Sequence, residues 1–463
     1  MTKPDTQFKD QGGAATMDPS VLRRWVVSRI MSNQASEQRM LAKRVKAEKK
    51  RANSGTPHTV EYFHQVDDGY SHLAAQVLER FCSRYNIELK CHLVSGPTGN
   101  NVYDTKLLSE LGLEDARAIS PHYDLNFPEI NHLPSTDCVS LAQRILSAQA
   151  QDNFVRVLND VSLALWCDDL DLLNNYAERY GCETNETALA SVTDGNARRD
   201  QLKHYSGAMF YYEGEWYWGI DRLYHLENRL RELNLDSTPE LPNLMPRQEI
   251  NIAKITNGAN LSLEIYVSLR SPYSAIAFDR SIRLAKEMGI NYVIRPVLPM
   301  VMRGVPTSLE KGLYILFDTA REARAAGIPF GPIYDPIGQP VRNGYALYHW
   351  AKQYDKGELF FSNFLRAAFV ERVNTNREKG LRYVVEQTGL DWHEAKENIN
   401  NTDWYEELET NRLTMLKSQL WGVPSFRLLD QDDHELLALW GQDRLWLLAK
   451  EIRRFSQHSH PEN

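Results

Sequence analysis

One short stretch combines residue types that could hold an anionic ligand: Ser271-Pro272-Tyr273-Ser274. It follows an apolar, strand-like run at 263–267 and precedes a helix-patterned segment that starts at Ala275. Serine followed by proline favours a helix start, because the hydroxyl accepts from a first-turn amide and the missing proline N–H has no helical partner. We expect Ser271 to cap this helix, at the positive end of its dipole and at the carboxyl end of a strand. An anion would be stabilised there, although ordinary capping explains the same residues.

Two further motifs follow in the same half of the chain: Trp421-Gly422-Val423-Pro424-Ser425-Phe426, and Trp440-Gly441-Gln442-Asp443-Arg444-Leu445, which opens a last helix. Taken in this order, the three motifs resemble the 2-hydroxychromene-2-carboxylate isomerase family. That family is similar to kappa-class glutathione transferases and to DsbA-type thioredoxin-fold proteins. The resemblance covers about residues 260–455 and implies a thioredoxin-like fold for this half.

The first half repeats the pattern of the second. Asp68-Gly69-Tyr70-Ser71 lies over the Ser271 motif, and Trp218-Gly219-Ile220-Asp221-Arg222-Leu223 lies over the Trp440 motif almost letter for letter. In the same comparison, residues 206–210 lie over 422–426, and 87–93 over 291–297. The repeat indicates two tandem copies of one unit.

The predicted fold class is α/β, with tandem thioredoxin-like domains that follow an N-terminal helical arm. Each domain is expected to be a small mixed sheet with a large helical insertion. The predicted parts are a disordered start and basic helical arm (1–57), a first domain (58–235), a linker (236–259), a second domain (260–456) and a tail (457–463).

The first copy departs from the family pattern at both critical positions. Asp68 stands in place of Ser271, and Ala208 in place of Pro424. An acid at a helix start is a good cap, but beside Asp67 it would repel a thiolate. The loss of proline removes the main reason for a cis peptide bond. We therefore interpret the first copy as degenerate and mainly structural.

The resemblance implies a glutathione site in the second copy. The bond before Pro424 would be cis, and Val423 would offer its backbone to the cysteinyl part of glutathione. Ser271 would donate a hydrogen bond to the sulfur and lower its pKa. Gln442 and Asp443 would hold the γ-glutamyl end, and Lys311 matches a lysine that family members direct at glutathione.

Two departures weaken this ligand set. Asp221-Arg222 recurs in the degenerate copy, so Asp443-Arg444 could be structural in both. No asparagine lies near Met302, where relatives often carry a ligand.

Composition narrows the class of protein. The chain has 463 residues, of which 42% are hydrophobic, and a net charge of -8, which argues against broad nucleic-acid binding. We found no apolar run long enough to span a membrane, no secretory signal and no metal-ligand spacing, so we expect a cytoplasmic protein without a metal. The five cysteines, Cys82, Cys91, Cys138, Cys167 and Cys182, form no C-x-x-C pair and all precede the second copy.

The segment 39–51 is strongly basic, with Glu48 as its single acid. It could bind an anionic surface or a partner. The alternative is a solvated arm that packs Leu22, Trp25, Ile30 and Leu41 on the body of the protein.

The leading hypothesis is a glutathione-dependent isomerase or transferase that acts on a small aromatic or electrophilic molecule. A DsbA-like thiol–disulfide oxidoreductase is one alternative, although the second copy has no cysteine. A non-catalytic binding or scaffold protein is the other.

Overall fold

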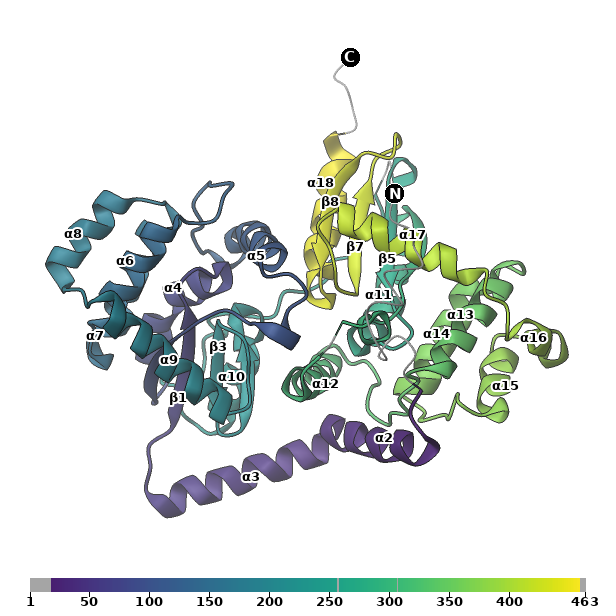
Figure 1. The fold of residues 1–463 in the computed structure, drawn as a ribbon, viewed down its shortest axis with the longest axis horizontal. Helices are drawn as coiled ribbons and strands as arrows, with labels where there is room; N and C mark the ends of the chain where they lie inside the picture. Colours follow the sequence, from purple (N-terminus) through teal and green to yellow (C-terminus); the bar gives the residue numbers. More distant parts are fainter. Residues whose placement is uncertain (1–17, 256–257, 306, 459–463) are drawn as a thin grey trace. The chain divides into compact units, whose positions relative to one another are not determined.

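The computed structural model divides into two compact units, shown with their element labels in Figure 1. The first unit is Leu41–Gln248, and the second unit is Met1–Met40 together with Glu249–Asn463. The residues described are 18–255, 258–305 and 307–458. The predicted disordered start (1–17) and most of the predicted tail therefore lie outside the described residues.

The first unit is built on a four-stranded sheet with the order β2-β1-β3-β4. Strand β1 pairs with β2 in parallel and with β3 antiparallel, and β3 pairs with β4 antiparallel. Its strands are β1 (Thr59–Gln65), β2 (Glu88–Val94), β3 (Met209–Tyr212) and β4 (Glu215–Trp218). Its helices after β1 are α4 (Gly69–Arg84), α5 (Thr105–Ile119), α6 (Thr136–Ser147), α7 (Gln151–Trp166), α8 (Leu170–Tyr180), α9 (Asn185–Gln201) and α10 (Gly219–Glu232).

The second unit contains a sheet of the same design, with the order β6-β5-β7-β8. Strand β5 pairs with β6 in parallel and with β7 antiparallel, and β7 pairs with β8 antiparallel. Its strands are β5 (Ser262–Val267), β6 (Asn291–Pro296), β7 (Ser425–Leu429) and β8 (Glu435–Trp440). Its helices after β5 are α11 (Pro272–Met288), α12 (Leu309–Ala325), α13 (Gln339–Lys352), α14 (Gly357–Phe369), α15 (Glu378–Gln387), α16 (Trp392–Asn398), α17 (Trp404–Lys417) and α18 (Leu445–His458).

The matching strand order and directions confirm the predicted fold class of two thioredoxin-like domains. One detail of the predicted repeat is wrong by a residue. Thr59 pairs with Glu88, and Ser262 pairs with Asn291, so Glu88 rather than Ile87 corresponds to Asn291. A one-residue slip moves every side chain to the other face of a strand, and the apolar letters alone did not fix the register.

A buried carboxylate lies at the same place in the central strand of each sheet. Glu264 on β5 is 3% exposed and accepts hydrogen bonds from Arg295 (2.6 Å), Arg427 and Tyr266 (2.6 Å). In the first unit Glu61 takes the same position and binds His92 and Arg198. Burial opposes ionisation, but the hydrogen bonds from Tyr266 and Arg295 outweigh it and lower the pKa of Glu264.

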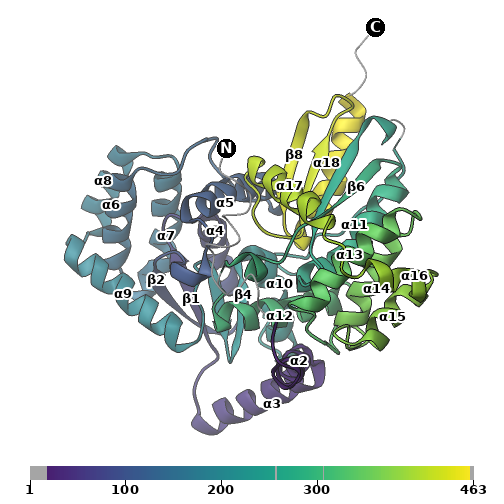
Figure 2. The same ribbon diagram turned by 45° about the vertical axis from the view of Figure 1, so that its right-hand side comes forward.

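The insertion of the second unit is helical, as predicted, and helices α13–α16 form one group in both views (Figures 1 and 2). Tyr345, Tyr348 and Trp350 of α13 are buried. They belong to the core of this unit.

The predicted N-terminal arm is helical, as α2 (Val21–Ala35) and α3 (Glu37–Ser54). The expectation that Leu22, Trp25 and Ile30 would pack on the body is wrong, because all three side chains are exposed. Helix α2 packs in the second unit through its polar side instead, where Arg24 is 1% exposed. The exposed fraction of Leu41 in α3 is also high.

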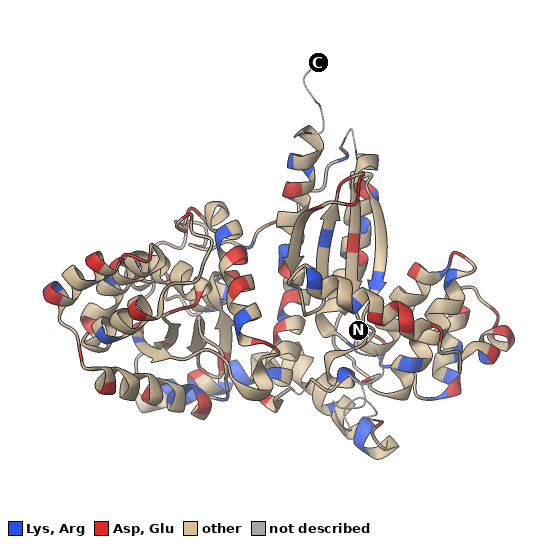
Figure 3. Ribbon diagram, turned by 45° about the horizontal axis from the view of Figure 1, so that its top comes forward, with Lys and Arg blue, Asp and Glu red and all other residues tan. Residues whose placement is uncertain are grey.

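Acidic and basic residues are both scattered over the helices (Figure 3). No helix among the described residues has the length and apolar character that crossing a membrane requires.

Candidate active site

Ser271 caps α11, as the sequence predicts. Its Oγ accepts from the N–H of Ser274 at 3.1 Å and donates to the carbonyl oxygen of Val423 at 3.3 Å. The Oγ of Ser274 in turn accepts from the N–H of Ser268, which ties the helix start to the end of β5. The hydroxyl of Ser271 therefore lies between a helix N-terminus and the backbone before Pro424.

The Val423–Pro424 peptide bond is cis, as the resemblance implies. Two glycines let the flanking motifs approach it. A Cβ on Gly422 would lie 2.4 Å from the indole nitrogen of Trp440, and Gly441 has φ +112°, which disfavours a side chain. The N–H of Gly441 donates to Pro424 O at 3.0 Å, so the second motif lies directly beside the first.

Lys311 lies in the first turn of α12, and its ammonium lies over the Trp421 ring, 5.5 Å from the centroid. Trp421 is two residues before Val423, so this contact brings Lys311 to the same edge of the domain. Burial lowers the pKa of Lys311 to about 8. The amine is therefore mainly cationic at neutral pH and loses its charge in mildly alkaline solution.

Gln442 begins the short 3-10 turn before α18 and is 2% exposed. Its amide donates to Glu322 at 2.9 Å and accepts from Arg280 at 3.1 Å. Arg280 lies on α11, the helix that Ser271 caps. The side chain of Gln442 thus connects three helical segments, and these bonds would have to exchange before it could contact a ligand.

Asp443 is half-buried, and the motif that contains it is repeated in structure as well as in sequence. The guanidinium of Arg444 donates to the backbone oxygen of Asp443, and that of Arg222 donates to the backbone oxygen of Asp221, both at 3.4 Å. Both arginines are buried. The shared geometry supports a structural role for the Asp-Arg pair, while the carboxylate of Asp443 keeps partial access to solvent.

The first unit has the same backbone arrangement at the equivalent position, but different residues occupy it. Asp68 caps α4 and accepts from the N–H of Ser71 at 2.9 Å. Ala208 takes the place of Pro424 and adopts the left-handed φ of +52°. The carbonyl of Ala208 accepts from the N–H of Gly219, just as the carbonyl of Pro424 accepts from the N–H of Gly441. Burial raises the pKa of Asp68 to about 6.

This raised pKa gives a prediction for Asp68→Asn. A carboxyl with a folded pKa near 6 and an unfolded value near 3.8 opposes folding once it ionises, so the parent loses stability as the pH rises from 4 to 6. Asparagine caps as well as aspartate. We expect the free energy of unfolding of the variant to exceed that of the parent by about 1–2 kcal/mol at pH 7 and to equal it near pH 4. Urea unfolding with hydrogen exchange of α4 peptides measures this, with Asp67→Asn as the control. An equal difference at both pH values would contradict the prediction.

Sequence reasoning missed one buried pair. The hydroxyl of Tyr273 donates to Asp318 at 2.8 Å, and that of Tyr70 donates to Asp115 at 2.7 Å. Asp318 also binds Arg321. Both pairs have the same separation along the chain, so the repeat itself contained the signal. The tyrosine two positions after each cap residue is thus fixed against the following helix.

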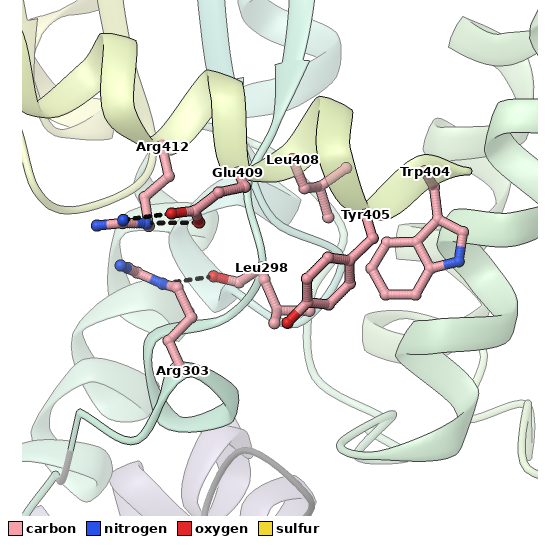
Figure 4. A pocket seen from close by; sticks show the side chains of 7 residues that line it. All are labelled: Leu298, Arg303, Trp404, Tyr405, Leu408, Glu409 and Arg412. Atoms are coloured by element: carbon pink, nitrogen blue, oxygen red, sulfur yellow. Dashed lines mark hydrogen bonds and ion pairs between the residues drawn. The ribbon is translucent and has the colours of Figure 1, made fainter. Parts of the chain in front are cut away.

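A small pocket lies between the end of β6 and α17 (Figure 4). Arg303 donates to Leu298 O at 3.0 Å, and Arg412 pairs with Glu409. Trp404, which also lines the pocket, stacks on Tyr345 at 5.6 Å. This cavity is far smaller than typical ligand sites, and we assign it no ligand.

Asp430, Asp432 and His434 place possible metal-ligand atoms within 4.8 Å of one another in the β7–β8 turn. Asp430 accepts from the N–H groups of Asp432 and His434, both at 2.9 Å. These bonds explain the cluster as turn structure.

Residues 262–453 match the family model of the DSBA-like thioredoxin domain. This part of the chain is a DSBA-like domain. The match begins at β5 and ends in α18, so it contains Ser271, Lys311, the cis proline and the Trp440 motif. No curated protein sequence matches the chain.

Solved structures with a similar fold include three that cover one copy. A probable DsbA oxidoreductase from Streptomyces coelicolor has 18% identity and a TM-score of 0.34, over 44% of this chain and 92% of that one. A 2-hydroxychromene-2-carboxylate isomerase has 20% identity and a TM-score of 0.35, over 42% and 97%. The cytosolic disulfide reductase DsbM from Pseudomonas aeruginosa has 16% identity and a TM-score of 0.34, over 42% and 97%. At these identities and scores we base no functional conclusion on them.

Proposed function

We propose that the DSBA-like domain is a glutathione-dependent isomerase or transferase that acts on a small aromatic or electrophilic substrate. The observation that carries the proposal is the hydroxyl of Ser271, which lies at the N-terminus of α11 and 3.3 Å from the carbonyl before the cis proline. A thiol–disulfide enzyme needs its own cysteine, and all five precede residue 183. A serine at this turn instead suits a sulfur that arrives with a ligand.

The residues at this edge fit glutathione in part. The carbonyl of Val423 can accept from an extended peptide, the mode of recognition in which a strand is added. The Lys311 ammonium and the half-buried Asp443 carboxylate could pair with the charged ends of the tripeptide. The side chain of Gln442 fits less well, because it is buried and bonded to Glu322 and Arg280. We therefore keep Gln442 only as a backbone contact at the start of the last helical segment.

Bound glutathione would supply a thiolate that adds to an electron-poor carbon and leaves again, so that a double bond changes its geometry without net oxidation. The chain's contribution is to keep that sulfur ionised. The Ser271 hydroxyl would give up its bond to the carbonyl of Val423 and donate to the sulfur instead, and the first-turn amides of α11 add the positive end of the helix dipole. The charge of Lys311 acts in the same direction.

The pH dependence of binding tests the role of Lys311. Because its pKa is about 8, the affinity for S-methylglutathione, which has no thiol to titrate, should fall as the pH rises from 7 to 9.5. Lys311→Met should bind about tenfold more weakly at pH 7, and the affinity of Lys311→Arg should fall less than that of the parent, because only the α-amino group of the ligand then titrates in this range. Calorimetric titration of the full chain measures all three. If the parent and Lys311→Met bind equally at pH 7, Lys311 is not a ligand; if the parent does not bind at all, the proposed function fails.

A further inference from the structure

Helix α2 is attached to the second unit by polar contacts. Arg24 donates to the backbone oxygen of Asp335 at 3.1 Å and to that of Ile337. The Oγ of Ser28 accepts from the N–H of Asp335 at 3.0 Å, and the Oγ of Ser32 accepts from the N–H of Ile333 at 2.9 Å. These contacts bury the polar side of α2 against the loop between α12 and α13.

The apolar side of α2 is consequently exposed. Four exposed apolar side chains lie within about 140° of one another around the helix: Leu22 (71% exposed), Trp25 (48%), Val26 (41%) and Ile30 (51%). We call these four residues the α2 apolar face. Helices of globular proteins usually bury their apolar side. Helix α2 instead buries polar side chains and exposes Leu22 and Trp25, which indicates that this side contacts an external surface.

The charged residues of α2 itself are all basic, and the exposed acids Asp18 and Glu37 lie beyond its two ends. Arg23 and Arg29 are exposed, the Arg29 guanidinium lies 5.3 Å from the centroid of the Trp25 ring, and residues 21–35 contain no acid. The chain as a whole has a net charge of -8, so this positive charge is local.

We propose that the α2 apolar face lies on an anionic phospholipid surface, with Leu22 and Trp25 at the level of the acyl–headgroup boundary and Arg23 and Arg29 paired with phosphates. A helix that binds in the plane of such an interface needs aliphatic and tryptophan side chains flanked by cations. Two copies paired through this face would bring arginines against arginines. The face of one 15-residue helix is also small beside the area of about 800 Å² per partner in stable protein interfaces.

Co-sedimentation of the full chain with vesicles tests the proposal. We expect binding to vesicles of phosphatidylcholine with phosphatidylserine, weakening as salt rises, and much less binding to phosphatidylcholine alone. The double variant Leu22→Ser with Trp25→Ser should bind the anionic vesicles about tenfold more weakly than the parent, or more weakly still. A matched control is Leu309→Ser with Leu413→Ser, because those leucines are 71% and 47% exposed elsewhere in the second unit. Replacing Arg23 and Arg29 by serine should reduce binding to the anionic vesicles.

Three outcomes would overturn the proposal. The first is no binding to anionic vesicles, and the second is binding that the Leu22 and Trp25 replacements leave unchanged. The third is sedimentation of the parent as a dimer that these replacements dissociate, which would assign the α2 apolar face to a second copy of the chain. Circular dichroism of each variant establishes that it is folded, and these exposed side chains make few contacts to lose.

Discussion

The Ser271→Cys variant is expected to carry a thiol that iodoacetamide alkylates about tenfold faster at pH 6 than the thiol of Ser418→Cys. Ser271 lies at the N-terminus of α11, whereas Ser418 lies at the C-terminus of α17 and beside Glu435. The two ends of a helix have opposite effects on a thiolate. The same substitution should therefore lower the pKa of the thiol at Ser271 and raise it at Ser418.

Peptide mass spectrometry measures the two rates separately from the five native cysteines. The Ser271→Cys variant should also gain exchange activity, with glutathione releasing the mixed disulfide that its thiolate forms on attacking a disulfide substrate. Equal alkylation rates at the two positions would show that the N-terminus of α11 does not stabilise a thiolate. In that case the chemistry proposed for Ser271 would lose its electrostatic basis.

Glu264→Ala is expected to destabilise the second unit by about 3–5 kcal/mol, because it leaves Arg295 and Arg427 without their shared carboxylate. Glu435→Ala is the matched control, since Glu435 also pairs with Arg427 (2.6 Å) but is about one-third exposed. The Glu435→Ala change should lower the stability of the second unit by about 1 kcal/mol or less.

Hydrogen exchange of β5 and β7 peptides measures the effect locally, with β1 peptides as the internal reference. The pKa of Glu264 is lowered in the folded state, so its contribution is present above the unfolded value near 4.5 and is lost as the pH falls below it. The difference between parent and Glu264→Ala should therefore shrink in acid. A loss no larger than that of Glu435→Ala would contradict the assignment of Glu264 as the central charge of the sheet.

The sequence predicted those features that depend on neighbouring residues. The cap at Ser271 and the start of α11 at Pro272 follow from local helix chemistry, and the repeat predicted two sheets of the same design. The burial of Gln442 was not predictable in this way. Its partners, Arg280 and Glu322, are more than a hundred residues away in the chain.

The orientation of α2 illustrates the same limit. The pattern of Leu22, Trp25 and Ile30 indicates which residues share a side of the helix, but not whether that side meets the protein. The backbone groups of the loop at 333–337 decide this, because they bind Arg24 and Ser28. Unpaired backbone groups of a loop can favour the polar side of a helix over its apolar side.

The most direct test of the proposed function is the ionisation of glutathione in its complex with the full chain. The ultraviolet absorbance of the thiolate, followed against pH, reports the pKa of the bound thiol. For the parent, the midpoint should lie below that of free glutathione, and Ser271→Ala should move it back up by about one unit. Ser20→Ala, which removes the cap of α2, is the control and should leave it unchanged. If parent and Ser271→Ala titrate identically, Ser271 is only the cap of its helix and the proposed role is wrong.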